Sequence, residues 1–93
     1  MDAATAEAEA LAAIKGFLET ATTLGPDALQ SPDTPLLEGG AIDSLGILQL
    51  TAHLEDTLGL RISDEDFVPE NFETIGSLVR FAARQLESRS VSA

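Results

Sequence analysis

Ser44 stands where a loop ends and an apolar helix begins, within residues 39–45 (GGAIDSL). A serine at the start of a helix holds its hydroxyl in solvent over the first turn. Unpaired backbone N–H groups and the positive end of the helix dipole favour an anion at that place. A phosphodiester on Ser44 would therefore be stabilised, and the preceding glycines leave room for a modifying enzyme. The pattern predicts that Ser44 accepts a phosphate-linked group.

Catalysis by Ser44 itself is disfavoured. A serine nucleophile needs a base within hydrogen-bond reach, and the single histidine, His53, lies nine residues later. On one helix this separation is a rise of about 13.5 Å. Asp43 is adjacent but is a weak base, and the spacing from Gly40 to Ser44 differs from the Gly-x-Ser-x-Gly elbow of hydrolases. We therefore expect a protein that is not an enzyme, in which His53 is a partly exposed helix residue.

A metal site is also not expected. Residues 63–66 (SDED) and Glu70 are dense in oxygen ligands. They do not match the calcium loop of an EF-hand. A single histidine and no cysteine also make a structural zinc site improbable. We expect these acidic side chains to form a solvent-exposed surface.

The chain has 93 residues, which fits one domain over 1–93, with a core at about 5–87 and a flexible tail at 88–93. Its formal net charge is −11. This charge argues against nucleic acid and against an acidic membrane surface, because both need a basic face. It favours a basic protein partner, although acidity also serves solubility alone.

No apolar run approaches the length of a membrane span. The beginning of the sequence lacks the basic region of a signal peptide. No cysteine is present for a disulfide or a thiol nucleophile. We expect a soluble, cytoplasmic monomer.

The hydrophobic spacing predicts an all-α fold. Three main helices are expected at about 5–22, 44–58 and 75–87, with a short helical turn at 64–67, a tight segment at 69–72 and a possible turn at 25–30. Ser63 with Asp66 resembles a capping pair for the turn at 64–67, and Thr74 can cap the last helix. A long loop, residues 23–42, joins the first two main helices, and Leu36 and Leu37 are expected to tie it to the core. No strand pattern or repeat is found. The elements predict an up-down helical bundle whose core is formed by the three main helices.

The helix at 44–58 carries two apolar stripes. Asp43 or Ser44 can cap its N-terminus. One stripe, suited to the core, consists of Ile47, Leu50, Leu54 and Leu58. The second stripe starts beside Ser44 and consists of Leu45, Leu48 and Ala52. The sequence leaves open whether neighbouring segments cover this second stripe or leave it exposed.

Asp43-Ser44-Leu45, which follows Gly40 and opens a leucine-rich helix, resembles the motif of the acyl carrier protein family, the phosphopantetheine-binding carrier proteins. The resemblance covers about residues 10–87. It continues in segments 34–37 (TPLL), 54–56 (LED), 58–62 (LGLRI), 63–66 (SDED) and 71–75 (NFETI). It implies the family's helical bundle. The tripeptide alone is a weak signal. The other matching segments, the length of the chain and its acidity make the resemblance stronger.

The resemblance implies a role for particular residues. Ser44 would carry a covalent 4′-phosphopantetheine arm, and Asp43 would help bind the Mg²⁺ used by the phosphopantetheinyl transferase that attaches it. Partner enzymes would then load acyl or aminoacyl groups onto the arm as thioesters and accept them from it. The resemblance also implies a surface for docking to these partners, made of Leu45, Leu48, Ala52, Glu55 and Asp56.

Gly46 and Gln49 depart from the pattern of fatty-acid-synthesis members, which commonly carry acids there. This departure argues against docking to the usual fatty acid enzymes. Segments 40–46 (GAIDSLG) and 69–72 (PENF) more closely resemble stand-alone carriers of specialised metabolism, including aminoacyl and unusual extender-unit carriers, within the broader range of fatty acid, polyketide and nonribosomal peptide biosynthesis. Two alternatives remain. The chain is either an acidic helical interaction module with no prosthetic group or a degenerate carrier that keeps the fold without the arm. The intact pair Asp43 and Ser44 argues against degeneracy.

Overall fold

The structure, a computed structural model, describes residues 2–38 and 40–91, with side chains as far as residue 88. The predicted all-α fold is confirmed, because these residues form helices and one isolated bridge between Pro35 and Thr74. The elements are α1 (Ala3–Ala21), α2 (Pro26–Gln30), α3 (Ser44–Leu58), the 3-10 turn η1 (Asp64–Asp66), α4 (Pro69–Phe72) and α5 (Ile75–Val91).

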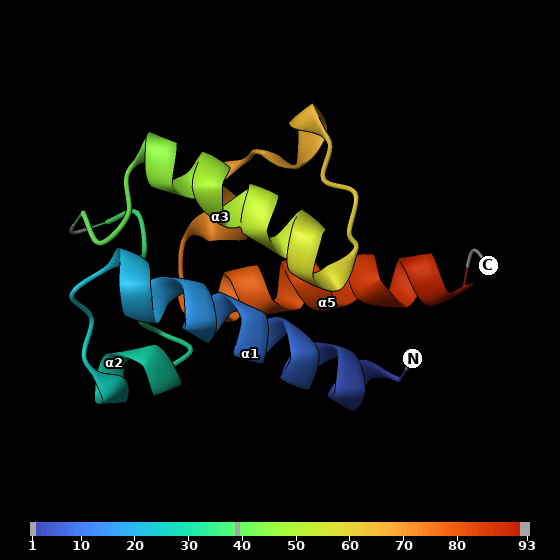
Figure 1. Cartoon of the computed structure of the whole chain (residues 1–93), viewed down its shortest axis with the longest axis horizontal. Helices are drawn as coiled ribbons and strands as arrows, with labels where there is room; N and C mark the ends of the chain where they lie inside the picture. The colour runs from blue at the N-terminus through green and yellow to red at the C-terminus, as the bar shows by residue number, and fades with distance from the viewer. Residues whose placement is uncertain (1, 39, 92–93) are drawn as a thin grey trace.

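The three long helices form the bundle. Helix α1 packs against both α5 and α3, and it runs antiparallel to both of them (Figure 1). The start of α1 and the end of α5 therefore lie at the same end of the molecule, and α3 begins at the opposite end. The side chains that fill the space between them with almost no exposed surface include Ile14, Leu18, Leu36, Leu50, Leu54, Ile75 and Leu78.

Helix α1 begins earlier than the expected position near residue 5. Asp2 is its N-cap, and its Oδ1 accepts a hydrogen bond from the N–H of Thr5 at 2.8 Å. This hydrogen bond lowers the pKa of Asp2. The carboxylate therefore stabilises the fold above the pKa that it has in the unfolded chain. That contribution is lost as the pH falls through the lowered value.

The long connection before α3 is fixed by backbone hydrogen bonds to the start of α5. The N–H of Leu36 donates to Glu73 O at 2.9 Å, and the N–H of Ile75 donates to Thr34 O at 3.0 Å. Leu36 is fully buried, as expected. The expectation for Leu37 was wrong, because 37% of this residue is exposed. Leu36 alone takes the core position, where the chain bends after the bridge between Pro35 and Thr74.

The segment between α3 and α5 contains short, capped pieces. The N–H of Ser63 donates to Asp66 Oδ2 at 3.0 Å, which confirms the expected capping pair of η1. Pro69 opens α4, where its fixed backbone angle suits a first turn. Thr74 precedes α5, and its hydroxyl oxygen accepts from the N–H of Ser77 at 3.0 Å. These caps confirm the approach to α5 that the sequence indicates.

Helix α5 extends beyond its expected end at residue 87 and reaches Val91. No glycine or proline follows Gly76 to stop it. The expected mobility of residues 88–93 stays a prediction, and residues 92–93 lie outside the described part of the chain.

Replacing Leu50 by alanine should lower the free energy of unfolding by about 2–5 kcal/mol, because its side chain is fully buried. Leu45→Ala on the same helix is the matched control. Since 63% of Leu45 is exposed, the expected change is within about 0.5 kcal/mol. Urea unfolding followed by circular dichroism measures both. Equal losses in the two variants would contradict the packing described for α3.

Candidate functional site

The turn before Ser44 is held by backbone and side-chain hydrogen bonds. Asp43 is the N-cap of α3, and its Oδ1 accepts from the N–H of Gly46 at 2.8 Å. Asp43 O accepts from the N–H of Ile47 at 2.8 Å. On the other side, the N–H of Ile42 donates to the carbonyl of buried Leu36 at 3.0 Å. The residues that flank Ser44 therefore have fixed positions.

Ser44 is the first residue of α3 and is exposed. Its hydroxyl takes part in no hydrogen bond within residues 2–38 and 40–91, so the local fold does not depend on it. The N–H groups of Ser44 and Leu45 also have no acceptor in this part of the chain, as expected for the first turn of a helix. These free donors and the dipole of a 15-residue helix favour a negatively charged group on the hydroxyl.

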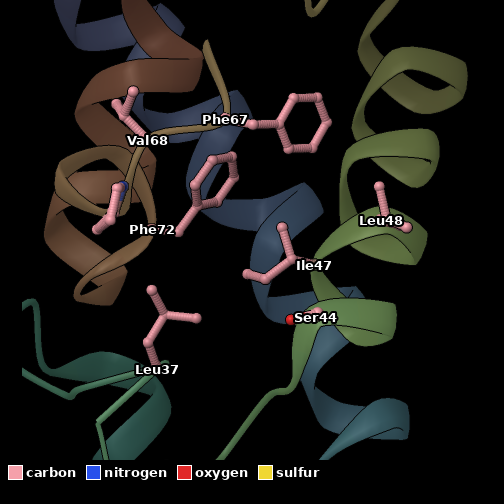
Figure 2. Close-up of a pocket in the computed structure, with 8 residues that line it drawn as sticks. Leu37, Ser44, Ile47, Leu48, Phe67, Val68 and Phe72 are labelled. Atoms are coloured by element: carbon pink, nitrogen blue, oxygen red, sulfur yellow. The ribbon is translucent and has the colours of Figure 1, made fainter. Parts of the chain in front are cut away.

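An apolar pocket of about 330 Å³ opens beside Ser44. Figure 2 shows Ile47 pointing from α3 toward Phe72, with Leu37 and Phe67 on either side and the Ser44 oxygen turned toward the same space. The wall is extended by ring stacking, since the centroids of Phe67 and Phe72 lie 5.9 Å apart. The pocket is lined by Leu37, Ser44, Ile47, Leu48, Phe67, Val68, Pro69 and Phe72.

The second apolar stripe of α3 is exposed, which settles the question that the sequence left open. Leu45 is 63% exposed and Leu48 55%, and Ala52 is exposed as well. The core stripe is buried at Ile47, Leu50 and Leu54 and half-buried at Leu58. Soluble monomers rarely expose large contiguous apolar patches. Neighbouring large apolar side chains that are exposed to solvent therefore indicate a surface for contact with another molecule.

The two acids at the end of α3 have different environments. Glu55 is half-buried, and its Oε2 accepts a hydrogen bond from the N–H of Ile62 at 3.0 Å. This contact fastens the chain after α3 back onto the helix. Asp56 is exposed, and its carboxylate makes no hydrogen bond within the described residues. Sequence reasoning grouped the two residues, whereas the structure gives Glu55 an internal contact and leaves the Asp56 carboxylate in solvent.

The structure places His53 in the contact between α1 and α3. It is half-buried, its ring centroid lies 5.5 Å from that of Phe17, and its Nε2 lies 3.5 Å from Thr57 Oγ1. Within the described residues, no group of acids and histidine is arranged to hold a metal ion. In the same part of the chain, no helix is both long and apolar enough to cross a membrane.

Comparison with known proteins agrees with this geometry. Residues 12–82 match the family described as "Phosphopantetheine attachment site". This match covers most of the chain, which therefore belongs to the phosphopantetheine-binding carrier family. The chain is also similar to the meromycolate extension acyl carrier protein of Mycobacterium leprae (strain TN). The identity is 27% over 90 residues, which cover 97% of this chain and 76% of the relative.

Membership of this family gives the protein its class of function. It is a carrier protein with a covalently attached 4′-phosphopantetheine group, and it is not an enzyme. The arm, when attached, supplies the thiol on which cargo is held. Family membership also implies interaction with a phosphopantetheinyl transferase and with acyl-handling enzymes. The hydroxyl of Ser44, which is exposed and makes no hydrogen bond within the described residues, fits such a group.

Replacing Glu55 by alanine should destabilise the protein by about 1 kcal/mol, because the partly buried N–H of Ile62 loses its acceptor. The matched control is Asp56→Ala, one position along the same helix. It should stay within about 0.5 kcal/mol, since its carboxylate has no such contact. Chemical unfolding measures both variants, and a larger loss for Asp56→Ala would contradict these assignments.

Proposed function

We propose that Ser44 is the residue that carries the phosphopantetheine arm. The observation that supports this most directly is the position of its hydroxyl. It is exposed and unbonded, stands at the N-terminus of α3 and faces an apolar pocket. The free N–H groups of the first turn favour the phosphodiester that would form there.

The proposed attachment is a phosphoryl transfer from coenzyme A, catalysed by the transferase. A bond forms between Ser44 Oγ and the phosphorus that bears pantetheine. The phosphoanhydride bond of coenzyme A breaks, and adenosine 3′,5′-bisphosphate leaves with the electron pair. The hydroxyl proton passes to a base of the transferase or to water. No redox change occurs, and the product is a phosphodiester.

Asp43 is proposed to assist this transfer through the Mg²⁺ of the transferase. Its Oδ1 is occupied by the N–H of Gly46, while its Oδ2 has no partner within the described residues. The carboxylate is exposed and directly precedes Ser44. One oxygen therefore serves the helix cap, and the other is free to approach a cation held beside the phosphates.

The surface beside Ser44 is proposed to dock partner enzymes. Leu45, Leu48 and Ala52 supply an exposed apolar stripe, and Asp56 supplies a charge farther along the same helix. An acidic residue at the rim of an apolar contact steers a basic partner more than it adds affinity. Glu55 has a smaller part in this proposal, because its carboxylate is engaged with Ile62.

The cargo is proposed to be an acyl or aminoacyl group held as a thioester. The name of the Mycobacterium leprae relative, an acyl carrier protein, supports an acyl cargo. The pocket of about 330 Å³ beside Ser44 offers apolar surface to the arm and to an apolar cargo. The start of α3, where Gly46 and Gln49 are uncharged, argues against the usual fatty acid enzymes as partners and so supports a stand-alone carrier of specialised metabolism.

Incubation with coenzyme A, Mg²⁺ and a broad-specificity phosphopantetheinyl transferase should add the mass of one phosphopantetheine group to the protein. The Ser44→Ala variant should add none, yet its free energy of unfolding should change by no more than about 0.5 kcal/mol, because Asp43 caps the helix. Intact-mass spectrometry and chemical unfolding measure the two effects. Ser63→Ala is the matched control and should still be modified. Modification of Ser44→Ala would refute the assignment.

Reversing the charge of Asp56 should slow association with a basic partner and weaken the dependence of the rate on salt. We expect Asp56→Lys to lower the association rate constant measured by stopped-flow fluorescence with the transferase. The matched control is Asp27→Lys, which makes the same exchange at an exposed position on α2. The docking proposal fails if the two variants associate at the same rate at low salt.

A further inference from the structure

Ile42 and Gly46 are in tight steric contact across the first turn of α3. A β-carbon built on Gly46 would lie 2.5 Å from Cγ1 and 3.3 Å from Cδ1 of Ile42. It would also lie 3.3 Å from Asp43 Oδ1, the atom that accepts the N–H of Gly46. A real β-carbon does not approach another carbon within 3.0 Å, so any side chain at residue 46 must displace Ile42.

Ile42 has little freedom to move away. Only 6% of the residue is exposed, and its N–H donates to Leu36 O at 3.0 Å. The obstructing atom, Cγ1, is next to the branched β-carbon, which makes rotation about the first side-chain bond costly. Displacing Ile42 would therefore move its backbone or bring apolar surface into water.

Ser44 lies midway between these two residues. Ile42 is at the position before the N-cap Asp43, and Gly46 is the third residue of the helix. Ile42 and Ile47, both buried, occupy the two positions of a hydrophobic staple, which fixes the angle at which a chain enters a helix. Glycine is less favourable than alanine inside a helix. The absence of a side chain at residue 46 is what allows Ile42 to take up this position.

We infer that Ile42 and Gly46 are positioning residues for the transfer of phosphopantetheine to Ser44. Their contact sets the angle between the preceding loop and α3, and thus the direction in which the Ser44 hydroxyl faces the transferase. The inference rests on the proposed role of Ser44. It adds that the missing side chain at residue 46 serves the speed of the transfer step, since glycine has a lower intrinsic helix propensity than alanine.

The test compares transfer rates for Gly46→Ala and wild-type protein, with coenzyme A, Mg²⁺ and the transferase. A shift of about 1 Å at a reacting group costs up to about 100-fold in rate. We expect kcat to fall by about tenfold or more, with KM for the carrier little changed because the docking surface is intact. Gly16→Ala on α1 is the matched control, since a β-carbon there meets no atom within 4 Å. It should leave kcat unchanged.

A second variant separates positioning from a loss of fold. In Ile42→Ala/Gly46→Ala the obstructing carbons are removed, so the new β-carbon at residue 46 has room. Ile42→Ala alone measures what the loss of the staple costs. We expect the double variant to match Ile42→Ala in kcat and to be faster than Gly46→Ala, with all three variants helical by circular dichroism. If Gly46→Ala loses helicity, the double variant should regain both helicity and rate.

Other outcomes overturn the inference in distinguishable ways. A folded Gly46→Ala variant with the kcat of wild-type protein would show that the contact does not position Ser44. A folded double variant as slow as Gly46→Ala, and slower than Ile42→Ala, would show that the contact with Ile42 is not the cause. If wild-type protein itself accepts no group, while a control carrier is modified in the same tube, the proposed function fails, and the inference fails with it.

Discussion

The capped first turn of α3 is the constraint on which the rest of the structure depends. Asp43 accepts a hydrogen bond from the N–H of Gly46 and so caps the helix without using the hydroxyl of Ser44. Because the cap is a neighbouring residue, the serine remains free for modification. The loop before it is fixed through Ile42 and Leu36, and the N–H of Leu36 in turn donates a hydrogen bond to Glu73 O, two residues before α5. The bundle thus fixes the position of the Ser44 hydroxyl oxygen through contacts that neighbouring residues make and that the oxygen itself does not.

Several elements could be predicted from the sequence because their signals are local. Helix α3 begins and ends where expected, since Asp43 caps it and Gly59 takes the left-handed conformation that ends it. The capping pair at Ser63 is equally local. The exposed position of Ser44 follows from its place at this helix start, so the main candidate residue was accessible to sequence reasoning.

Other features could not be predicted, either because they join segments far apart in the chain or because their local signal is weak. The pocket brings Leu37 from the loop before α3 against Phe67 and Phe72 from the segment after it. The hydrogen bond between Glu55 and Ile62 joins residues seven positions apart, across the end of α3. The early start of α1 was missed because a single aspartate near the beginning of the chain gives a weak signal. The contact between Ile42 and Gly46 depends on side-chain direction, which hydrophobic spacing does not encode.

The central claim is that the hydroxyl of Ser44, among all the serines of the chain, receives the prosthetic group. Its most direct test is to treat the wild-type protein with coenzyme A and the transferase, digest it, and locate the modified residue by fragmentation of the peptides in a mass spectrometer. The account predicts phosphopantetheine on the peptide containing residues 40–50, with the fragment ions assigning it to Ser44. A group found on a peptide that contains a different serine, with the Ser44 peptide unmodified, would contradict it.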